Sequence, residues 1–353
     1  MHIEFGPGDL RTFEAGLQRE WLLTNGIGGY ASGTVNCVNT RRYHGLLVAA
    51  LRPPLGRVAL LLRLNEAVTI DGETTELTAA EYSDGTVFPA DHRHLDSFML
   101  EDGSPVWSYT VSGHLIRRKI WMVPNRNITI VRYRLAVGSG SVALAIRPLC
   151  ASRDHHTLQR FNAGWSFSVV PDDGIVRVQA GPSAAPLWLA SKGASFVPGG
   201  DWYWRFLLRE ERTRGYDYVE DLYQPGTFHA TLEPGGTLTL IASAEDPAEG
   251  LPDPDAALAA LRSTGVRGRN ARQKTADKDS VCLAEVEEAL TTAAQRFVVR
   301  GVVAADGNTY TSNISGYHWG QDWGRDAAAS LPGLLLATGR LHDAQSLLRG
   351  LAA

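Results

Sequence analysis

Short runs of β-branched or alternating apolar residues recur from about residue 20 to residue 245, with no helical pattern between the early runs. Alternation of this kind predicts strands that bury one face, and Asp-Gly pairs favour tight hairpins between antiparallel strands. Because helices do not alternate with these strands, a parallel α/β sheet does not fit the pattern. We therefore expect a mainly β fold, built as a large antiparallel β-sandwich. The expected strands cover residues 43–49, 58–70, 115–123, 128–137, 141–146, 165–170, 175–180 and 237–242, with turns at Asp71-Gly72, Asp84-Gly85, Asp102-Gly103, Gly138-Ser139-Gly140, Asp173-Gly174 and Gly235-Gly236.

A helical pattern replaces the strands near residue 254. Residues 254–262 are rich in alanine and leucine, and a second helix follows that Ser280 can cap at its N-terminus. The polar and basic residues 266–279 between the two helices have no interleaved aromatics, so we interpret them as a solvated linker and not as a nucleic-acid site. The apolar positions of the second helix have helical spacing and are Val286, Ala289, Leu290, Ala293 and Phe297.

The C-terminal residues continue the helical pattern after an extended piece over residues 297–304. One helix passes through Leu331, Leu334 and Leu335 and ends at Gly339. Pro332 lies inside it and should bend it or mark its first turn. A further helix begins near Leu341, and its expected apolar face consists of Ala344, Leu347, Leu348 and Leu351.

The chain ends at Ala353 inside this helical pattern. Three or four helices cannot close a helical domain, because their apolar faces would lack partners. We therefore expect this chain to be one piece of a longer protein. The predicted domains are a β-sandwich over residues 1–262, a linker with its helix over residues 263–300, and an incomplete helical domain over residues 301–353.

Composition limits the classes of partner. A chain of 353 residues with 44% hydrophobic content can bury a large core. The net charge of −4 and the pI of about 6.2 give no reason to expect nucleic acid or membrane as a partner. Residues 1–5 lack the start of a signal peptide, and no apolar run approaches the ~18–20 residues of a membrane span. The distant cysteines Cys37, Cys150 and Cys282 indicate reduced thiols in a cytoplasmic protein, and no cofactor is expected.

The stretch from His318 to Asp326 is the strongest candidate for a functional site. It places two indoles, two carboxylates, a guanidinium and an imidazole within one short loop. Such a loop is poor core material, because nearly every side chain needs a polar partner. Flat aromatic faces can pack on the C–H surface of a pyranose, and Arg-Asp pairs can hold its hydroxyls. The alternative interpretation is a solvated turn before a helix.

Residues 26–31 (GIGGYA) fit the dinucleotide-binding fingerprint by letter only. The residues that follow do not open a helix, and no acidic residue lies ~20 positions further on. Glycines also permit positive φ and close backbone approach. We therefore interpret this motif as a tight turn between strands that packs against a neighbouring domain.

Two acidic and histidine-containing groups were considered as metal sites. They are Asp91, His92, His94 and Asp96, and Asp154, His155 and His156. Neither has a familiar ligand spacing on a strand or helix. We interpret both groups as surface loops with local hydrogen bonds and expect no metal.

Residues 201–206 (DWYWRF) concentrate aromatic side chains. Strand alternation would place Trp202 and Trp204 on one face and Tyr203 and Arg205 on the other. Two interpretations stay open: core packing with an inter-domain face, or a platform that contacts glycans.

Several motifs together resemble the prokaryotic glycogen debranching enzymes. Residues 20–34 (EWLLTNGIGGYASGT) and 40–47 (TRRYHGLL) are similar to the N-terminal domain of this family. Residues 323–326 (WGRD), running into 331–334 (LPGL) and 338–340 (TGR), resemble the opening of its amylo-α-1,6-glucosidase domain. Later landmarks of the N-terminal domain are residues 147–149 (RPL), 153–156 (RDHH), 214–217 (RGYD), 220–222 (EDL) and 225–226 (PG).

The resemblance implies a β-supersandwich followed by the (α/α)6 barrel of a six-hairpin glycosidase. It also implies hydrolysis of α-1,6-glucosidic branch points in glycogen or limit dextrin. In an inverting enzyme, as this family is expected to be, a carboxylic acid protonates the leaving oxygen. A second carboxylate ~6.5–9.5 Å away then activates water. Both groups are expected beyond Ala353, so this chain is expected to lack them and to be inactive alone.

The resemblance also assigns residues to the substrate site. In related (α/α)6 glycosidases, an Arg-Asp pair after a tryptophan grips the non-reducing glucose. Carried over, Arg325 and Asp326 would bind its hydroxyls, and Trp319 and Trp323 would form the wall of the subsite. The predicted substrate-binding set is His318, Trp319, Asp322, Trp323, Arg325 and Asp326.

This chain departs from the family at three positions. The family commonly has an aromatic where Gly320 stands, a threonine where Ala327 stands and an aromatic where His155 stands. The glycine puts the shape of the substrate wall in question. Two alternative functions stay open, a non-catalytic glucan-binding module and another (α/α)6 glycosidase that is glucoamylase-like. The oligomeric state stays undetermined.

Overall fold

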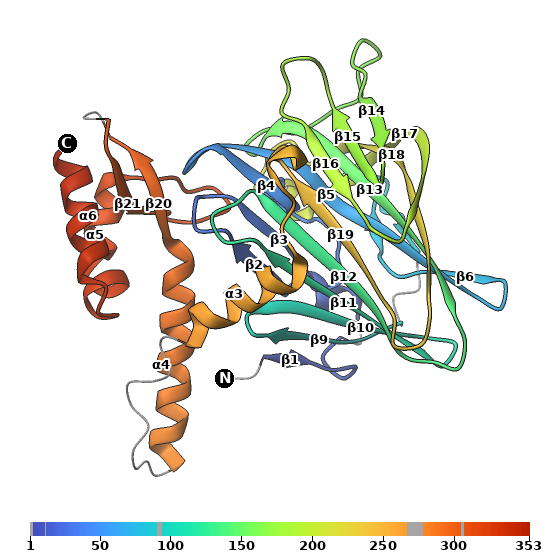
Figure 1. The fold of residues 1–353 in the computed structure, drawn as a ribbon, viewed down its shortest axis with the longest axis horizontal. Coiled ribbons are helices and arrows are strands. Elements are labelled where there is room, and N and C mark those ends of the chain that lie inside the picture. The colour runs from blue at the N-terminus through green and yellow to red at the C-terminus, as the bar shows by residue number, and fades with distance from the viewer. Residues whose placement is uncertain (1–2, 11, 90–93, 267–277, 305–306) are drawn as a thin grey trace.

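The computed structural model describes residues 3–10, 12–89, 94–266, 278–304 and 307–353. Two large antiparallel sheets stack face to face, and a smaller unit of helices and one hairpin lies beside them (Figure 1). The mainly β fold expected from the sequence is therefore confirmed. Among the described helices, none is long and apolar enough to cross a membrane.

The first sheet has nine strands in the order β1-β9-β10-β11-β12-β19-β16-β15-β14. Four of its strands, β9 to β12, meander along the chain, and β19 returns to pair with β12. The strands are β1 (Glu4–Phe5), β9 (Leu95–Glu101), β10 (Ser104–Val111), β11 (His114–Met122), β12 (Ile128–Val137), β14 (Ser168–Asp172), β15 (Ile175–Gln179), β16 (Leu187–Ala190) and β19 (Thr237–Ser243).

The second sheet has eight strands in the order β17-β18-β13-β5-β4-β3-β2, with β6 paired to β5. Its outer face carries Val299, Ile314 and Tyr317 from the C-terminal part of the chain. The strands are β2 (Glu20–Thr24), β3 (Tyr30–Thr34), β4 (Gly45–Arg52), β5 (Leu55–Ile70), β6 (Glu73–Glu76), β13 (Val142–Asp154), β17 (Ser195–Leu207) and β18 (Val219–Leu232), and a separate small hairpin joins β7 (Ala80–Glu81) to β8 (Val87–Phe88).

Two of the predicted Asp-Gly turns have the backbone conformation of tight β-hairpins. Asp71 and Gly72 both have positive φ, of 50° and 86°, and so do Asp102 and Gly103, of 52° and 76°. Two consecutive residues with positive φ form the turn whose twist matches antiparallel strands. These turns join β5 to β6 and β9 to β10.

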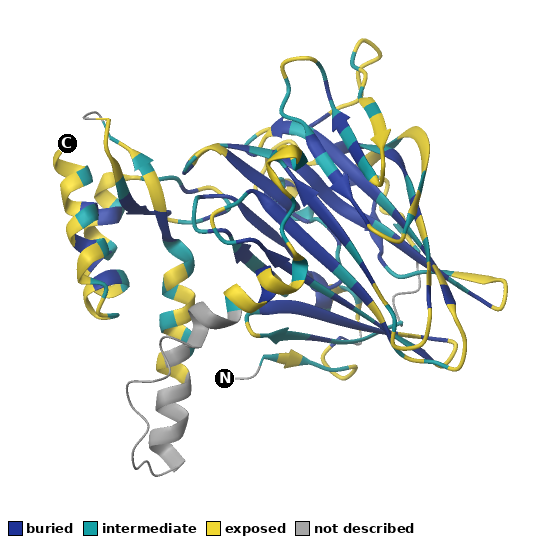
Figure 2. Cartoon of the chain, viewed as in Figure 1, coloured by how far each residue is buried: buried dark blue, intermediate teal, exposed yellow. Residues whose placement is uncertain are grey.

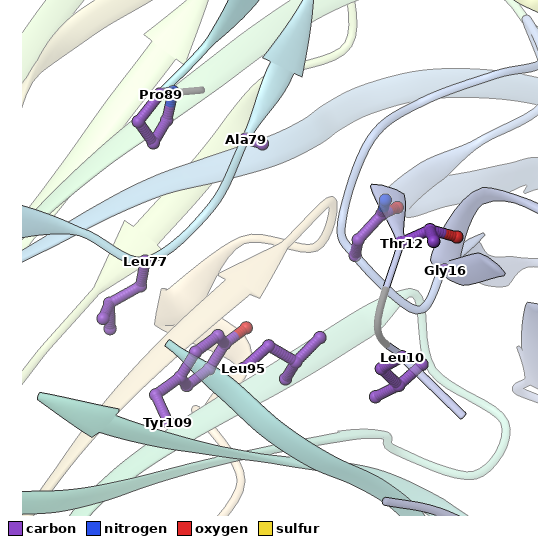
Figure 3. A pocket seen from close by; sticks show the side chains of 9 residues that line it. Leu10, Thr12, Gly16, Leu77, Ala79, Pro89, Leu95 and Tyr109 are labelled. Atoms are coloured by element: carbon purple, nitrogen blue, oxygen red, sulfur yellow. The ribbon is translucent and has the colours of Figure 1, made fainter. Parts of the chain in front are cut away.

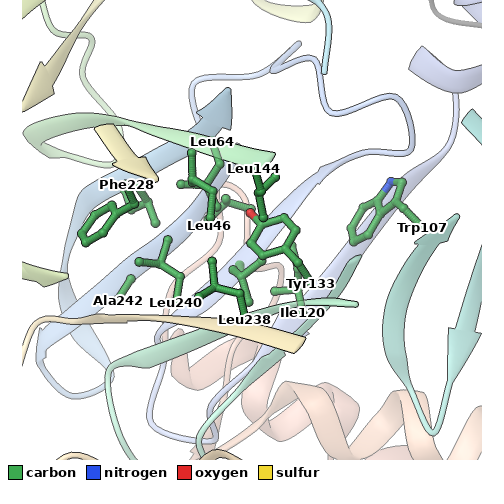
Figure 4. Packing of buried hydrophobic residues seen from close by; sticks show 14 of the residues in the cluster. Leu46, Leu64, Trp107, Ile120, Tyr133, Leu144, Phe228, Leu238, Leu240 and Ala242 are labelled. Atoms are coloured by element: carbon green, nitrogen blue, oxygen red, sulfur yellow. The ribbon is translucent and has the colours of Figure 1, made fainter. Parts of the chain in front are cut away.

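The core lies between the two sheets and contains large apolar side chains from both (Figure 4). Trp107, Tyr133 and Phe228 are almost fully buried in it. One charged pair is buried with them, since Arg118 donates to both oxygens of Glu66 at 2.9 and 3.0 Å. Burial of this pair is tolerated because the hydroxyl of Tyr133 also donates to Glu66, at 2.7 Å. Among the described residues, the buried ones gather on the strands of the two sheets (Figure 2).

The helices that follow the sandwich begin close to the predicted positions. They are η1 (Pro247–Glu249), α3 (Pro254–Val266), α4 (Lys278–Phe297), α5 (Gly324–Leu331), η3 (Pro332–Leu336) and α6 (Leu341–Ala352). Two short helices, α1 (Phe13–Leu17) and α2 (Arg209–Thr213), lie within the sandwich. Helix α3 packs Ala257 and Leu258 against the outer face of the nine-stranded sheet. Helix α4 begins at Lys278, so the prediction that Ser280 caps it was wrong, because the first turn starts before that residue.

The C-terminal unit combines a hairpin with two helical segments. Strand β20 (Val298–Val303) confirms the extended piece predicted there and pairs with β21 (Thr309–Asn313). Pro332 marks the junction between α5 and the π-helical turn η3, and Gly339 follows with a φ of 74°. Helix α6 buries Ala344 and Leu347 against this unit, whereas Leu348 and Leu351 are exposed. The apolar face predicted for that helix is therefore only half covered.

Candidate functional site

The segment that connects β21 to α5 packs on the outer face of the eight-stranded sheet. Ile314 and Tyr317 are buried there, together with Val299 of β20. Their partners are apolar side chains of the sheet, among them Tyr30 and Leu62. The β-sandwich therefore sets the position of the segment that continues into the predicted sugar-binding stretch.

Arg57 of β5 anchors this segment to the eight-stranded sheet. The side chain is buried, and its Nη1 donates to the carbonyl oxygens of Tyr317 and Gly320, each at 3.0 Å. Its guanidinium lies 5.3 Å from the ring centroid of Tyr317 and 5.9 Å from that of Tyr30. Sequence reasoning missed Arg57, because it lies in a β strand pattern and carries no motif of its own.

His318 packs into the sandwich as a neutral side chain. Ser32 Oγ donates to the carbonyl of Trp21 at 2.8 Å, so it accepts the contact of 2.9 Å from His318 Nε2. The imidazole stacks on the ring of Tyr43, with centroids 6.2 Å apart and planes 21° apart. Burial, with the nearby charge of His44, lowers the pKa of His318 to about 4. The proton on Nε2 follows from the hydrogen-bond network.

His318, Glu20 and His44 have the spacing of a metal site, since their ligand atoms lie within 4.8 Å of one another. The hydrogen bonds favour a different role. The backbone N–H of Thr40 donates to His44 Nδ1 at 3.1 Å, so a neutral His44 carries its proton on Nε2, which faces Glu20 Oε1 at 3.5 Å. A metal would need the lone pair of that nitrogen. The residues present therefore fit a hydrogen-bonded cluster better than a metal centre.

Glu20 joins this cluster to an arginine. Arg41 Nε donates to Glu20 Oε1 at 2.8 Å. Burial alone would raise the pKa of Glu20, but the hydrogen bonds and charges of His44 and Arg41 outweigh it and lower the pKa to about 2. Glu20 is therefore ionised at neutral pH and orients both partners.

Trp319 stands beside this cluster and is 52% exposed. The guanidinium groups of Arg41 and Arg214 lie 5.9 and 5.6 Å from its ring centroid. Tyr43 lies edge-on to the indole at 6.4 Å. An exposed indole among arginine side chains can pack on a sugar face while the arginines donate to its hydroxyls.

The motifs that were separate in the sequence meet around Trp319 and Gln321. Gln321 Nε2 lies 3.4 Å from His156 Nε2, and the hydroxyl of Tyr43 lies 3.3 Å from His156 Nδ1. Arg42 Nη1 donates to the carbonyl of His156 at 2.7 Å and also contacts Asp217. Residues 40–47, 153–156, 214–217 and 318–321 therefore form one continuous surface. Asp154, His155 and His156 belong to this surface. The prediction of a surface loop was wrong for His155, because its ring is buried against Tyr43.

The other predicted site residues lie at the start of α5. Asp322 is half-buried and accepts a hydrogen bond from the Ser312 hydroxyl, and burial raises its pKa. Trp323 is the N-cap residue of the helix and is 49% exposed. Arg325 is largely exposed, and its Nε donates to Asp326 Oδ1 at 3.0 Å. Arg325 and the half-buried Asp326 can together offer donors and an acceptor to neighbouring hydroxyls.

The remaining sequence motifs have structural roles. The glycine motif of residues 26–31 joins β2 to β3, with Gly26 and Gly28 at φ of 82° and 97°. A Cβ at Gly28 would lie 2.5 Å from the carbonyl oxygen of Pro54. Gly26 accepts a hydrogen bond from the Arg300 N–H at 3.0 Å, so the motif packs against β20 as predicted. Of the first candidate metal group, Asp91 and His92 lie outside the described residues, while His94 and Asp96 each contact Thr110.

A small cavity lies elsewhere, between the N-terminal segment and the nine-stranded sheet (Figure 3). It is lined mainly by apolar side chains, among them Leu10, Leu77, Leu95 and Tyr109, and its volume is about 20 Å³. This space holds a water molecule but no pyranose ring.

Profiles of two protein families match the chain in sequence order. The family described as "Glycogen debranching enzyme N terminal" matches residues 19–239. The chain belongs to the glycogen debranching enzyme family. The family described as "Amylo-alpha-1,6-glucosidase" matches residues 292–353, which include the whole predicted sugar-binding stretch. The resemblance that the motifs indicated is therefore confirmed.

Several solved structures are similar to this debranching family chain. A bacterial glucoamylase complexed with acarbose has 12% identity, a TM-score of 0.45, and coverage of 94% of this chain and 49% of its own. A putative kojibiose phosphorylase from human microbiome has 9% identity, a TM-score of 0.34, and coverage of 84% and 40%. The GH92 family glycosyl hydrolase ccman5 has 15% identity, a TM-score of 0.39, and coverage of 94% and 54%. The chain thus spans about half the length of these proteins. A comparison with curated protein sequences found no match.

Proposed function

We propose that this chain is the N-terminal part of an enzyme that hydrolyses α-1,6-glucosidic branch points in glycogen or limit dextrin. The observation that carries the proposal is the ordered match to the debranching N-terminal family and to the amylo-α-1,6-glucosidase family. The substrate is accordingly an α-glucan. The cytoplasmic location stays a prediction from the cysteine content.

In this proposal the surface around Trp319 and the start of α5 form part of the glucose subsite. Arg325 and Asp326 hold hydroxyls of the glucose that is released. Arg325 is largely exposed, and its hydrogen bond to Asp326 places a donor and an acceptor side by side. Trp319 and Trp323 supply exposed indoles for its ring faces. His318 acts indirectly, because its contacts with Ser32 and Tyr43 set the direction of the neighbouring Trp319.

The two carboxylates of this stretch are better suited to binding than to acid–base chemistry. Asp326 accepts a hydrogen bond from Arg325 through Oδ1, and this pairing suits it to hold a hydroxyl next to the guanidinium. Asp322 is occupied by the hydroxyl of Ser312. We therefore propose that the catalytic acid and base lie outside these 353 residues. Helices α5 and α6 are proposed as the first helices of the (α/α)6 barrel.

The substitution Asp326→Asn in the intact enzyme tests the binding role. Loss of a charged acceptor for a substrate hydroxyl should lower kcat/KM on limit dextrin by about 1.5–3 kcal/mol. The control is Asp255→Asn, because Asp255 lies on the distant helix α3 and pairs only with Arg132 among the described contacts. An unchanged kcat/KM for Asp326→Asn would refute the role.

Two further readouts separate the alternative functions. A preference of the intact enzyme for maltose over panose and limit dextrin would replace the debranching assignment with a glucoamylase-like one. Measurable glucose release from limit dextrin by the 353-residue chain would contradict the placement of the acid and base outside it.

A further inference from the structure

Six aromatic side chains gather on the surface formed by β17, β18 and the segment between β13 and β14. We call them the aromatic patch: Phe161, Trp165, Phe167, Trp202, Trp204 and Tyr223. Trp204 is 52% exposed and Phe161 is 46% exposed, whereas the other four are half-buried and support them. Exposed aromatic groups of this kind mark interaction surfaces, because leaving them in water forfeits the gain from burial.

A β-bulge directs Trp204 outward. In the pairing of β17 with β18, Tyr203 lies opposite Leu222 and Phe206 lies opposite Glu220, so Trp204 and Arg205 together face one residue, Asp221. Arg205 has a φ of +67°, in the left-handed region that a non-glycine residue rarely adopts. Bulges re-aim side chains, and such strained positions cluster at functional sites.

Asp221 holds the two exposed rings in one geometry. Its buried carboxylate accepts from the backbone N–H of Arg205 at 2.8 Å and from that of Phe161 at 2.9 Å. Its own backbone N–H donates to the carbonyl of Gln159 at 2.9 Å. The segments that carry Phe161 and Trp204 are therefore tied to the same buried group. Burial of a carboxylate is costly unless hydrogen bonds compensate it, and these two backbone donors supply that compensation. The carboxylate therefore favours the one arrangement in which both donors reach it.

The rings form a corner. Phe161 stands at 75° to Trp202 and at 85° to Trp204, with centroid distances of 5.3 and 6.2 Å. Successive units of an α-1,4-linked glucan are turned relative to one another, so its chain presents a curved surface that inclined rings can follow. Asp201 and Arg205, the chain neighbours of the two tryptophans, are exposed; Asp201 Oδ1 accepts from the Trp202 N–H at 2.7 Å and Arg205 Nε donates to Ser83 Oγ at 2.9 Å, so the carboxylate and the guanidinium keep part of their capacity for sugar hydroxyls. Neutral hydroxyls suit this mixed rim better than a partner with one sign of charge.

We propose that Phe161, Trp202 and Trp204 form a glucan-binding surface on the β-sandwich, in addition to the site around Trp319. It would hold an unbranched α-1,4-linked stretch of the polymer. The inference rests on the proposed function for its choice of ligand. Asp221 is a positioning residue in this surface, since it contacts backbone groups and not the glucan.

Binding of maltoheptaose to the chain tests the proposal, because this linear probe has no branch point and its binding does not depend on hydrolysis. Trp204→Ala and Phe161→Ala should each weaken binding by about tenfold, equivalent to ~1.4 kcal/mol. Trp204→Phe keeps a ring and should retain most of the affinity. The control Phe88→Ala removes another phenyl that is 59% exposed, on β8, and should leave binding unchanged.

The outcomes separate this surface from the other site and from protein association. Wild-type affinity in Trp204→Ala and Phe161→Ala, with binding lost in Trp319→Ala, would overturn the proposal. Conversion of an oligomer to a monomer by Trp204→Ala without a change in maltoheptaose affinity would also overturn it, since a second copy would then be the occupant. Melting temperatures of all variants confirm that each one is folded. If the intact enzyme fails to cleave limit dextrin but maltoheptaose binding depends on Trp204, the surface stands while the proposed reaction falls.

Discussion

Gly320 shows how a single residue can change a site. The family commonly has an aromatic side chain at this position, but here an added Cβ would lie 2.5 Å from the backbone nitrogen and 2.7 Å from the carbonyl oxygen of Gly316. Its own N–H donates to that carbonyl at 2.6 Å. An aromatic side chain would therefore require a different path of residues 315–320. The proposed substrate wall of this chain therefore has no aromatic side chain at position 320.

Gly320→Ala is expected to destabilise the fold by about 1–3 kcal/mol, because close backbone atoms cannot move aside as a flexible side chain can. Urea denaturation of both proteins measures the difference. Gly333→Ala is the matched control, since no heavy atom lies within 4 Å of its added Cβ and the residue is helical. Equal losses in the two variants would contradict this interpretation.

The site residues illustrate what patterns along the chain can reveal. Trp319, Asp322, Trp323, Arg325 and Asp326 were predicted because their residue types are unusual so close together. The partners of Trp319 were not predictable as a set, since Arg41 and Arg214 are far apart in the sequence and meet only through the pairing of distant strands.

At the scale of elements, the segment between β21 and α5 depends on the sandwich for its shape. Arg57 of β5 bonds two of its carbonyls, of Tyr317 and Gly320, across a buried interface. The Nε and Nη2 atoms of Arg57 have no hydrogen-bond partner among the described residues. Arg57 therefore contributes to stability mainly through its hydrogen bonds to these two carbonyl oxygens.

Arg57→Met is expected to lower the free energy of unfolding by about 2–4 kcal/mol, because two buried carbonyls lose a charged donor. In the intact enzyme it should also weaken glucan binding, since the turn that carries Trp319 would loosen. Equilibrium denaturation and maltoheptaose titration measure the two effects. Arg52→Met, on the neighbouring strand β4, removes an exposed arginine and serves as the control. Similar stability in both variants would count against the role of Arg57.

The strands were predictable in outline and less so in detail. The strand predicted at residues 128–137 coincides with β12, and the turn at Asp102-Gly103 joins β9 to β10. Within β17 only residues 201–206 show recognisable strand alternation, because the bulges after Pro198 and Tyr203 interrupt the pattern on which such predictions rest. Those interruptions are also what turns Trp204 outward.

At the scale of the whole molecule, buried histidines couple the fold to pH. Burial lowers the pKa of His155 to about 3 and that of His318 to about 4. In the unfolded chain both titrate near ~6.5. Between the two values the unfolded chain binds more protons than the folded one, so stability rises with pH. The contribution is complete above about pH 6.5 and is lost as the pH falls toward 4. Glu20, whose pKa is lowered to about 2, adds to the loss below its unfolded value of 4.5.

The free energy of unfolding should therefore fall by about 1.4 kcal/mol per pH unit for each of these histidines between pH 6.5 and 4.5. Urea denaturation at pH 7.5, 6.0 and 5.0 measures the slope. His318→Gln should flatten it, because one of the two groups no longer titrates. His342→Gln replaces an exposed histidine of α6 and should leave the slope unchanged. A slope that is the same in His318→Gln and the wild type would refute the coupling.

The sequence by itself determined the class of fold and the family, and it singled out the residues that we propose bind a sugar. These properties depend on local patterns: alternation that buries one face of a strand, Asp-Gly turns with positive φ, and motifs read within one segment. Only the tertiary structure decided that residues 40–47, 153–156 and 214–217 surround Trp319, that Arg57 holds its turn, and that Phe161 and Trp204 share the support of Asp221. Those contacts join strands that are distant in the chain, and their geometry depends on register shifts and tautomers that no local pattern records.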